Sequence, residues 1–215
     1  MDRRQGYDRT TRKTVAGEVI HYGILHGNEE IVFIKVGADG SIRGYQDKYL
    51  TMAHRVHDRL GATVICASNP CDVEYEDQLV ADQAMISKVA ADCGFSDCEI
   101  YFVGTSDGGY HNLLLAQRVP QTVKLLGINA SLKNEDDFLE KLQAIPHITK
   151  CLVYGTKDDA KQFVPVLQTL ESEKLEILTV EGADHEFAGM VDEFIALIDL
   201  IQREEPGYEL LHFKV

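Results

Sequence analysis

The pattern Gly-x-Ser-x-Gly occurs at residues 104–108, where the chain reads GTSDG. It follows the apolar run Glu99–Val103 and precedes a helical stretch, so Ser106 is expected on a strand-to-helix turn. Glycines on both sides allow a sharp turn that lifts the serine hydroxyl out of a sheet. The pattern alone is weak, because a glycine-rich turn with an incidental serine has the same letters. The chemistry it would support is nucleophilic attack by Ser106.

Two later segments contain the acid and the base that would activate a serine. Asp158 and Asp159 follow the apolar run Lys150–Tyr154, and His185 follows the run Leu175–Val180. The order Ser, Asp, His along the chain is the order expected when the serine stands on such a turn. The steps from the serine to Asp158 and from there to His185 are 52 and 27 residues, so each can hold one or two strand–helix units. The sequence therefore predicts that the three loops meet at one edge of a sheet.

The elements that must position these residues alternate along the chain. Apolar or β-rich runs are found at Glu30–Val36, Ala62–Ala67, Glu99–Val103, Val123–Asn129, Lys150–Tyr154 and Leu175–Val180. Continuous apolar runs suit strands that are covered on both faces. Apolar residues recur at helical spacing over Tyr45–Leu60, Glu76–Cys93 and Phe187–Ile201. This alternation predicts an α/β fold with a doubly wound, mostly parallel sheet flanked by helices.

The amino-terminal part of the chain and the chain length lead to further expectations. One or two antiparallel strands within Val15–Leu25 are expected at the sheet edge. The polar residues 1–13 include Arg3, Arg4, Arg9, Arg12 and Lys13 and are expected to form a flexible tail. The 215 residues are expected to form a single domain, since α/β domains of 200 to 250 residues are common.

Composition excludes several classes of function. The chain has 21 Lys and Arg against 35 Asp and Glu, a net charge of −14, and no basic stripe, so nucleic acid is not an expected partner. No apolar run approaches the roughly 18 residues of a membrane span, and no apolar segment follows the basic start, so a cytoplasmic protein with no membrane partner is expected. Five cysteines are an odd number in a chain with no expected export signal, which favours reduced thiols. They form no CxxC, so a metal site is not expected.

The motifs GTSDGG, YGTKDD and EGADHEF together resemble those of an α/β-hydrolase-fold serine hydrolase, over about residues 15–203. The resemblance implies that Ser106 is the nucleophile, His185 the general base and Asp158 the acid, with Asp159 as the alternative. It implies an acyl-enzyme mechanism, no cofactor and a small-molecule acyl substrate. It also implies an oxyanion hole that consists of the backbone N–H groups of Asp107 and of Ala38. The family often has His-Gly at the start of the second loop, where this chain has Val36 and Gly37.

The stretch between Val123–Asn129 and Lys150–Tyr154 is the place where this family often inserts a lid. Only about twenty residues stand there, enough for one crossover helix, so a lidless, open site for small or flexible acyl groups is expected. The hypothesis that the protein is an ester or thioester hydrolase has two alternatives. One is a peptidase or amidase with the same triad, and the other is a non-catalytic binding or scaffold protein on the same fold. The oligomeric state stays open.

Two other polar residues can be explained by structural roles outside the catalytic chemistry. His111 follows Ser106 by five residues on the expected helix, which turns it away from the serine, so a packed or surface histidine is expected. Asn69 follows the run Ala62–Ala67 and would either line the rim of a pocket or belong to an ordinary turn.

Overall fold

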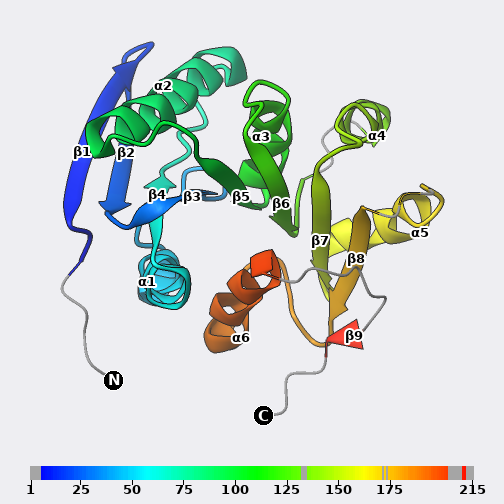
Figure 1. Cartoon of the computed structure of the whole chain (residues 1–215). Coiled ribbons are helices and arrows are strands. Elements are labelled where there is room, and N and C mark those ends of the chain that lie inside the picture. Colours follow the sequence, from blue (N-terminus) through cyan, green and yellow to red (C-terminus); the bar gives the residue numbers. More distant parts are fainter. Residues whose placement is uncertain (1–5, 132–134, 171, 173, 203–209, 212–215) are drawn as a thin grey trace.

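The structure is a computed structural model that describes residues 6–131, 135–170, 172, 174–202 and 210–211. A nine-stranded sheet runs through it in the order β1-β2-β4-β3-β5-β6-β7-β8-β9 (Figure 1). The strands are β1 (Arg9–Val15), β2 (Glu18–Leu25), β3 (Asn28–Lys35), β4 (Ala62–Ala67), β5 (Glu99–Thr105), β6 (Thr122–Ile128), β7 (Thr149–Gly155), β8 (Leu175–Val180) and β9 (Leu210–Leu211). From β4 to β9 all neighbours pair in parallel, while β2 pairs antiparallel with β1 and with β4. The predicted mostly parallel α/β sheet is therefore confirmed.

Helices cover both faces of the sheet, as Figure 1 shows. The helices are α1 (Lys48–Leu60), α2 (Tyr75–Cys93), α3 (Asp107–Ala116), α4 (Glu135–Gln143), α5 (Val164–Leu167) and α6 (Val191–Ala196). Short 3₁₀ turns η1 (Tyr45–Asp47), η2 (Asp159–Phe163) and η3 (Leu197–Gln202) adjoin α1, α5 and α6. Helices α1 and α6 pack on one face, and α2, α3, α4 and α5 pack on the other.

The continuous apolar strands follow from this double cover. In β3, Ile31 and Phe33 join the core under α2 and α3, while Val32 and Ile34 join the core under α1 and α6. All four side chains are fully buried. Because successive side chains point to opposite faces, a strand that is covered on both faces has apolar residues at consecutive positions.

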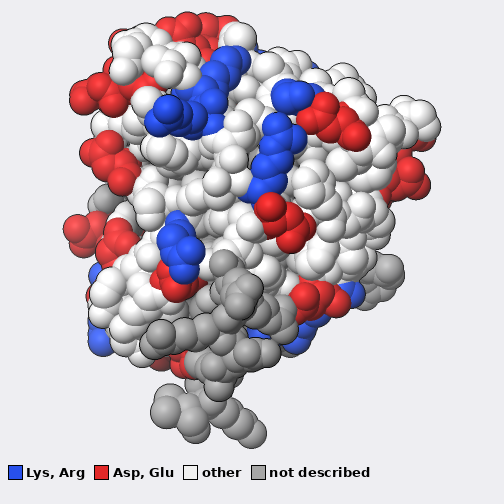
Figure 2. All heavy atoms as spheres, turned by 90° about the vertical axis from the view of Figure 1, so that its left-hand side faces the viewer, with Lys and Arg blue, Asp and Glu red and all other residues white. Residues whose placement is uncertain are grey.

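The amino-terminal expectation needs a correction. The polar composition of residues 1–13 predicts a flexible tail, but Arg9–Val15 form β1, which pairs along its whole length with β2. Residues 1–5 lie outside the described part. Figure 2 looks onto this side of the molecule and shows Lys and Arg interspersed with Asp and Glu. Arg9 lies 3.4 Å from Asp92 of α2, and Lys88 also pairs with Asp92. Alternation of half-buried and exposed residues in β1 is the pattern of an edge strand.

The carboxyl-terminal helix is shorter than its apolar stripe predicts. Phe187, Phe194, Ile198 and Ile201 are all buried as expected, but only Val191–Ala196 are α-helical and a 3₁₀ turn follows. Phe187 has a φ of 57° and Gly189 a φ of 74°, so the helix cannot begin before them. The apolar spacing therefore predicts correctly which of these side chains are buried, although Phe187 lies in the loop before the helix.

Among the described residues between β6 and β7, α4 is the single helix, so the expected crossover without a lid is confirmed. No helix in the described ranges is both long and apolar enough to cross a membrane.

Candidate active site

Ser106 stands on the turn between β5 and α3, at the carboxyl edge of the sheet. Its backbone has φ 53° and ψ −122°, a conformation that side chains with a Cβ rarely adopt. The turn is held by hydrogen bonds: the Ser106 amide donates to Ile128 O at 2.9 Å, and the amides of Gly109 and Ser131 donate to Ser106 O at 3.0 Å each. These bonds overdetermine the strained turn and aim the hydroxyl away from the sheet.

The glycines of the motif are required by close approach. A Cβ on Gly104 would lie 2.3 Å from Gly108 O, and a Cβ on Gly108 would lie 2.4 Å from the carbonyl oxygens of both Lys35 and Val36. Real Cβ atoms do not come so near to backbone, so the end of β5, the start of α3 and the end of β3 can meet only through glycine. The sequence expectation of a tight strand–turn–helix is confirmed here.

The serine, a histidine and an aspartate form a hydrogen-bonded row. His185 Nε2 lies 2.9 Å from Ser106 Oγ, and His185 Nδ1 lies 2.9 Å from Asp158 Oδ2. The Asp158 side chain is 4% exposed, whereas the His185 side chain is 45% exposed. Of the two candidate acids, Asp158 faces the ring, and Asp159 is an exposed residue of η2. The loops after β5, β7 and β8 thus bring together three residues that are up to 79 positions apart.

The carboxylate of Asp158 is oriented by its own turn. Oδ1 accepts a hydrogen bond from the Ala160 amide at 2.9 Å, as the N-cap of η2, and the Asp158 amide donates to Gly155 O at 3.1 Å. Because one carboxylate oxygen caps the turn, the other is presented to the imidazole. A ring N–H held in this way leaves Nε2 as the acceptor for the serine hydroxyl.

Asn129 organises the loop that contains His185, although no motif of the sequence marks it. Its Nδ2 donates to Asp184 O at 3.1 Å and to His185 O at 3.0 Å, and its Oδ1 accepts from the Gly155 amide at 2.8 Å. Asn129 is buried, with a φ of 47°. An asparagine directly after an apolar strand was the available signal, since Asn tolerates positive φ better than most residues.

Gly37 lies beside the nucleophile, and Ala38 follows it in the chain. A Cβ on Gly37 would be 3.5 Å from Ser106 Cβ, an ordinary contact. In this loop the Asp39 amide donates to Asn69 O and the Gly40 amide to Gly37 O, while the Ala38 amide donates to no group among the described residues. Asp107 opens α3, so its amide belongs to the first turn, where N–H groups lack an intrahelical acceptor. Both amides that the resemblance implies for an oxyanion hole thus belong to segments next to Ser106.

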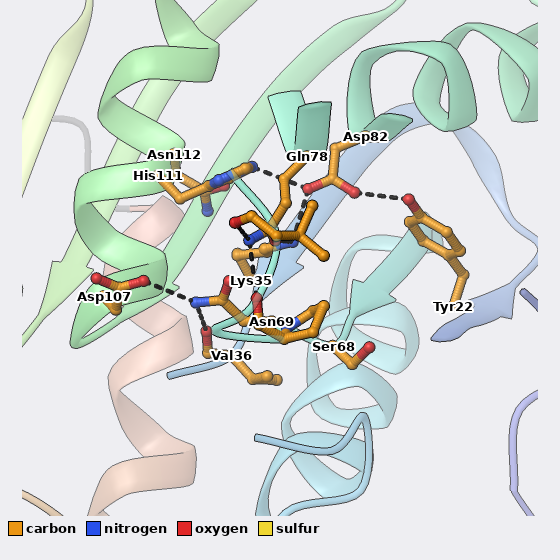
Figure 3. A network of polar contacts seen from close by, with 12 residues as sticks. Tyr22, Lys35, Val36, Ser68, Asn69, Gln78, Asp82, Asp107, His111 and Asn112 are labelled. Atoms are coloured by element: carbon orange, nitrogen blue, oxygen red, sulfur yellow. Dashed lines mark hydrogen bonds and ion pairs between the residues drawn. The ribbon is translucent and has the colours of Figure 1, made fainter. Parts of the chain in front are cut away.

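Asn69 is neither a pocket-rim residue nor part of a simple turn. It is 1% exposed, and its Nδ2 donates to Val36 O at 3.3 Å and to Asp107 Oδ2 at 3.2 Å (Figure 3). The Tyr75 hydroxyl donates a further hydrogen bond to Asp107 Oδ1. The residue therefore links the β3–α1 loop to the start of α3.

A buried group of charged side chains lies behind these contacts, visible in Figure 3. Lys35 Nζ is 2.8 Å from Asp82 Oδ2, His111 Nε2 is 2.9 Å from the same oxygen, and the Tyr22 hydroxyl donates to Asp82 Oδ1 at 2.7 Å. Burial opposes ionisation of Asp82, but Lys35 and then His111 overcome it and hold its pKa at about 2. Burial, together with Lys35, lowers the pKa of His111. His111 is thus a packed histidine, one of the two alternatives that the helical spacing allowed.

A cavity of about 520 Å³ opens on the histidine side of the row. Its walls come from the ends of β6, β7 and β8 and include Asn129, Ser131, Phe163 and His185. The lining residues include one lysine, Lys157, and four carboxylates, which belong to Asp158, Asp159, Asp184 and Glu186. This volume is in the range of small-molecule sites. In the part of the chain that the structure describes, no three His, Cys, Asp or Glu side chains are arranged to hold a metal ion.

Comparisons with known proteins identify the fold. No protein-family model matches the chain, and no curated protein matches it in sequence. Among solved structures, the chain is similar to an α/β serine hydrolase homologue from Coxiella burnetii, with a TM-score of 0.70, 17% identity and coverage of 92% of this chain and 98% of that one. It is also similar to Est1E from Butyrivibrio proteoclasticus with bound ferulic acid, with a TM-score of 0.69, 13% identity and coverage of 91% and 98%.

A third similar structure also lacks a lid. It is an α/β serine hydrolase without a lid from Xanthomonas campestris, with a TM-score of 0.64, 16% identity and coverage of 93% of this chain and 97% of that one. The matched regions span nearly the whole of both chains in each of the three comparisons. The chain has the α/β-hydrolase fold in its lidless form.

Proposed function

We propose that this chain is a serine hydrolase that cleaves small acyl esters or thioesters through a covalent acyl-enzyme. Ser106 is the nucleophile, His185 the general acid and base, and Asp158 the acid that orients His185. The observation that carries the proposal is the continuous row from Ser106 Oγ through both ring nitrogens to Asp158 Oδ2, with 2.9 Å at each step. The strained backbone of Ser106 supports it, because such strain is kept where a side chain must be presented in one geometry.

Acylation follows from this arrangement. Ser106 Oγ attacks the acyl carbon while His185 Nε2 takes the hydroxyl proton, which turns a weak nucleophile into an effective one. Asp158 accepts the hydrogen bond from Nδ1–H and stabilises the imidazolium. As the carbon–oxygen or carbon–sulfur bond breaks, Nε2 returns the proton to the leaving group. The acyl group is then bonded to Ser106.

The oxyanion hole of the proposed mechanism consists of the amides of Asp107 and Ala38. The negative charge that develops on the carbonyl oxygen is stabilised by hydrogen bonds from fixed backbone dipoles, which need not reorganise during the reaction. The N-terminal end of α3 adds its positive dipole. For deacylation, His185 removes a proton from water, the hydroxide attacks the acyl carbon, and the proton passes back to Ser106 as the acid leaves.

The substrate class rests on size and charge. The cavity beside His185 has about 520 Å³, and the crossover between β6 and β7 supplies α4 in place of a lid, which suits short acyl groups. The wall of this cavity carries one lysine against three carboxylates besides Asp158, so neutral or cationic substrates are favoured over anionic ones.

A fluorophosphonate probe tests the nucleophile without knowledge of the natural substrate. The folded protein should be labelled at Ser106, while heat-denatured protein and Ser106→Ala should not. Ser106→Ala should also lower kcat for p-nitrophenyl acetate by at least about 10³-fold. Folded protein that is not labelled would support a binding or scaffold role instead.

A chain-length series tests the substrate class. The value of kcat/KM should be highest for p-nitrophenyl acetate or butyrate and should fall for the decanoate and longer esters. A matched set of p-nitroanilides should be cleaved far more slowly than the esters. Preference for long chains would contradict the open small site, and faster cleavage of the anilides would favour an amidase or peptidase.

A further inference from the structure

Asn69 contacts both segments that are proposed to supply the oxyanion hole. Its Nδ2 donates to Val36 O at 3.3 Å and to Asp107 Oδ2 at 3.2 Å, and its own carbonyl accepts from the Asp39 amide at 2.7 Å. We infer that Asn69 is a positioning residue that sets the spacing of the Ala38 and Asp107 amides. The inference rests on the proposed function and adds a residue to that site.

In the β3–α1 loop, Asn69 contacts residues on both sides of Ala38, the proposed donor. Its side chain holds the carbonyl of Val36, and its main chain holds the amide of Asp39, so the two residues between them are fixed at both ends. Ala38 is one of those two residues. The direction of a backbone N–H is set by the peptide planes around it, so anchoring both flanks aims the Ala38 amide.

On the nucleophile side, Asn69 anchors the first residue of α3. The Asp107 carboxylate is fixed by Asn69 at Oδ2 and by the Tyr75 hydroxyl at Oδ1. Val36 O and Asp107 Oδ2 are both acceptors, so the amide nitrogen of Asn69, not its oxygen, must face them. One NH₂ group therefore connects Val36, at the start of the β3–α1 loop, with Asp107, at the start of α3, as Figure 3 shows.

The loop that contains Asn69 is itself held firmly. Gln78 Nε2 donates to Pro70 O at 3.0 Å and to Val73 O at 3.1 Å, while Gln78 Oε1 accepts from Lys35 Nζ at 3.0 Å. On the other side, the Ser68 amide donates to His21 O at 2.9 Å, a main-chain bond that does not depend on the Ser68 side chain. The buried Lys35–Asp82 pair thus supports the loop through Gln78, and the loop can act as a fixed reference for Asn69.

Asn69 acts through these backbone groups and does not reach substrate. Its side chain is 1% exposed and does not line the cavity beside His185. A shift of the hole weakens contacts with the oxyanion, which exists only in the transition state and the tetrahedral intermediate. Loss of Asn69 should therefore lower kcat and leave KM nearly unchanged.

Two variants of Asn69 and one matched control test this role. Asn69→Leu removes both donated bonds and also removes Oδ1, which is buried without a hydrogen-bond partner among the described residues. Asn69→Asp keeps the shape but places a carboxylate against Asp107 and the Val36 carbonyl. The control, Ser68→Ala, removes a partly buried hydrogen bond of the same loop that faces β2 instead of the hole.

The readouts are kcat and KM for p-nitrophenyl acetate, inhibition by phenylboronic acid, which forms a tetrahedral serine adduct, and the melting temperature. Each Asn69 variant should lower kcat about 10- to 100-fold, with KM within about threefold and boronate affinity weakened in parallel. Ser68→Ala should lower the melting temperature while kcat stays near the wild-type value.

The inference is overturned if the Asn69 variants match Ser68→Ala in kcat, or if their whole effect is on KM. Failure of the proposed function gives different results. If the proposed function is wrong, the wild-type protein is not labelled by the fluorophosphonate at Ser106, or Ser106→Ala keeps its turnover, whatever the Asn69 variants do.

Discussion

The backbone of Gly108 packs so closely on Lys35 that a Cβ at position 108 would lie 2.4 Å from the Lys35 carbonyl oxygen. This contact joins the first turn of α3 to the last residue of β3, at the point where the Val36–Gly37–Ala38 loop begins. The separation of the nucleophile from that loop therefore depends on the absence of one methyl group.

Gly108→Ala should destabilise the protein, although alanine ordinarily favours a helix. The added methyl group must push α3 away from β3, and such overpacking costs about 1–3 kcal/mol, against a helix-propensity gain of about 1 kcal/mol. Urea denaturation measures the difference. Gly37→Ala is the matched control for stability, since its Cβ would make ordinary contacts at 3.5 and 3.6 Å. Equal stability of the two variants would contradict the close packing at Gly108.

The strain at Ser106 leads to a second prediction. Alanine retains the Cβ that makes φ 53° and ψ −122° unfavourable, whereas glycine does not. Strain of this kind costs about 1–3 kcal/mol, and the greater backbone entropy of unfolded glycine offsets part of it. Ser106→Gly should therefore be more stable than Ser106→Ala by about 1 kcal/mol in urea denaturation, with both inactive. A more stable Ser106→Ala would mean that the turn carries no strain.

The two neighbouring aspartates should respond very differently to the same change. Asp158→Asn disturbs the hydrogen bond that orients the ring of His185, and kcat should fall by about 10⁴-fold, as in other Ser-His-Asp triads. Asp159→Asn alters the cavity wall but no contact with the ring, so its effect should fall mainly on KM. Steady-state kinetics of both variants on p-nitrophenyl acetate decides the matter. The reverse ranking would assign the acid to Asp159.

Stability should decrease with falling pH because of the buried cluster. The folded pKa of Asp82 is about 2, below its ordinary value of 3.8, so its contribution is complete above about pH 4 and is lost as pH falls towards 2. The pKa of His111 is lowered below 6.5, so protonation of the unfolded chain weakens stability below that pH as well. The groups that face Asp82 are Lys35 from β3, Tyr22 from β2 and His111 from α3.

Urea denaturation at pH 7, 5, 4 and 3 checks this expectation, with Asp82→Asn as the comparison. The wild-type free energy of unfolding should fall at each step, and the variant should show a flatter dependence below pH 4. A wild-type protein whose stability is constant from pH 7 to pH 3 would show that the cluster does not titrate as its contacts require.

Local patterns were sufficient for most of the architecture. The runs Ala62–Ala67 and Leu175–Val180 match β4 and β8 to the residue, because strands covered on both faces are mostly apolar. The expectation failed at both ends of the chain. Arg9–Val15 form a strand only through pairing with β2, and Phe187 leaves the helix because of its backbone conformation and that of Gly189. Neither pairing partners nor positive φ values can be read from hydrophobic spacing.

Apolar runs and motif order along the chain were enough to predict the fold class and the order of Ser106, Asp158 and His185, because parallel strands bring their carboxyl ends to one edge. The packing of distant segments was needed to show which of Asp158 and Asp159 faces His185, and that Asn129 and Asn69 hold the surrounding loops. Asn69 lies 38 residues from Asp107 along the chain, and its contacts exist only after β4, β3 and α3 have packed together. A polar side chain acquires such a role from its neighbours in space, which spacing along the chain does not specify.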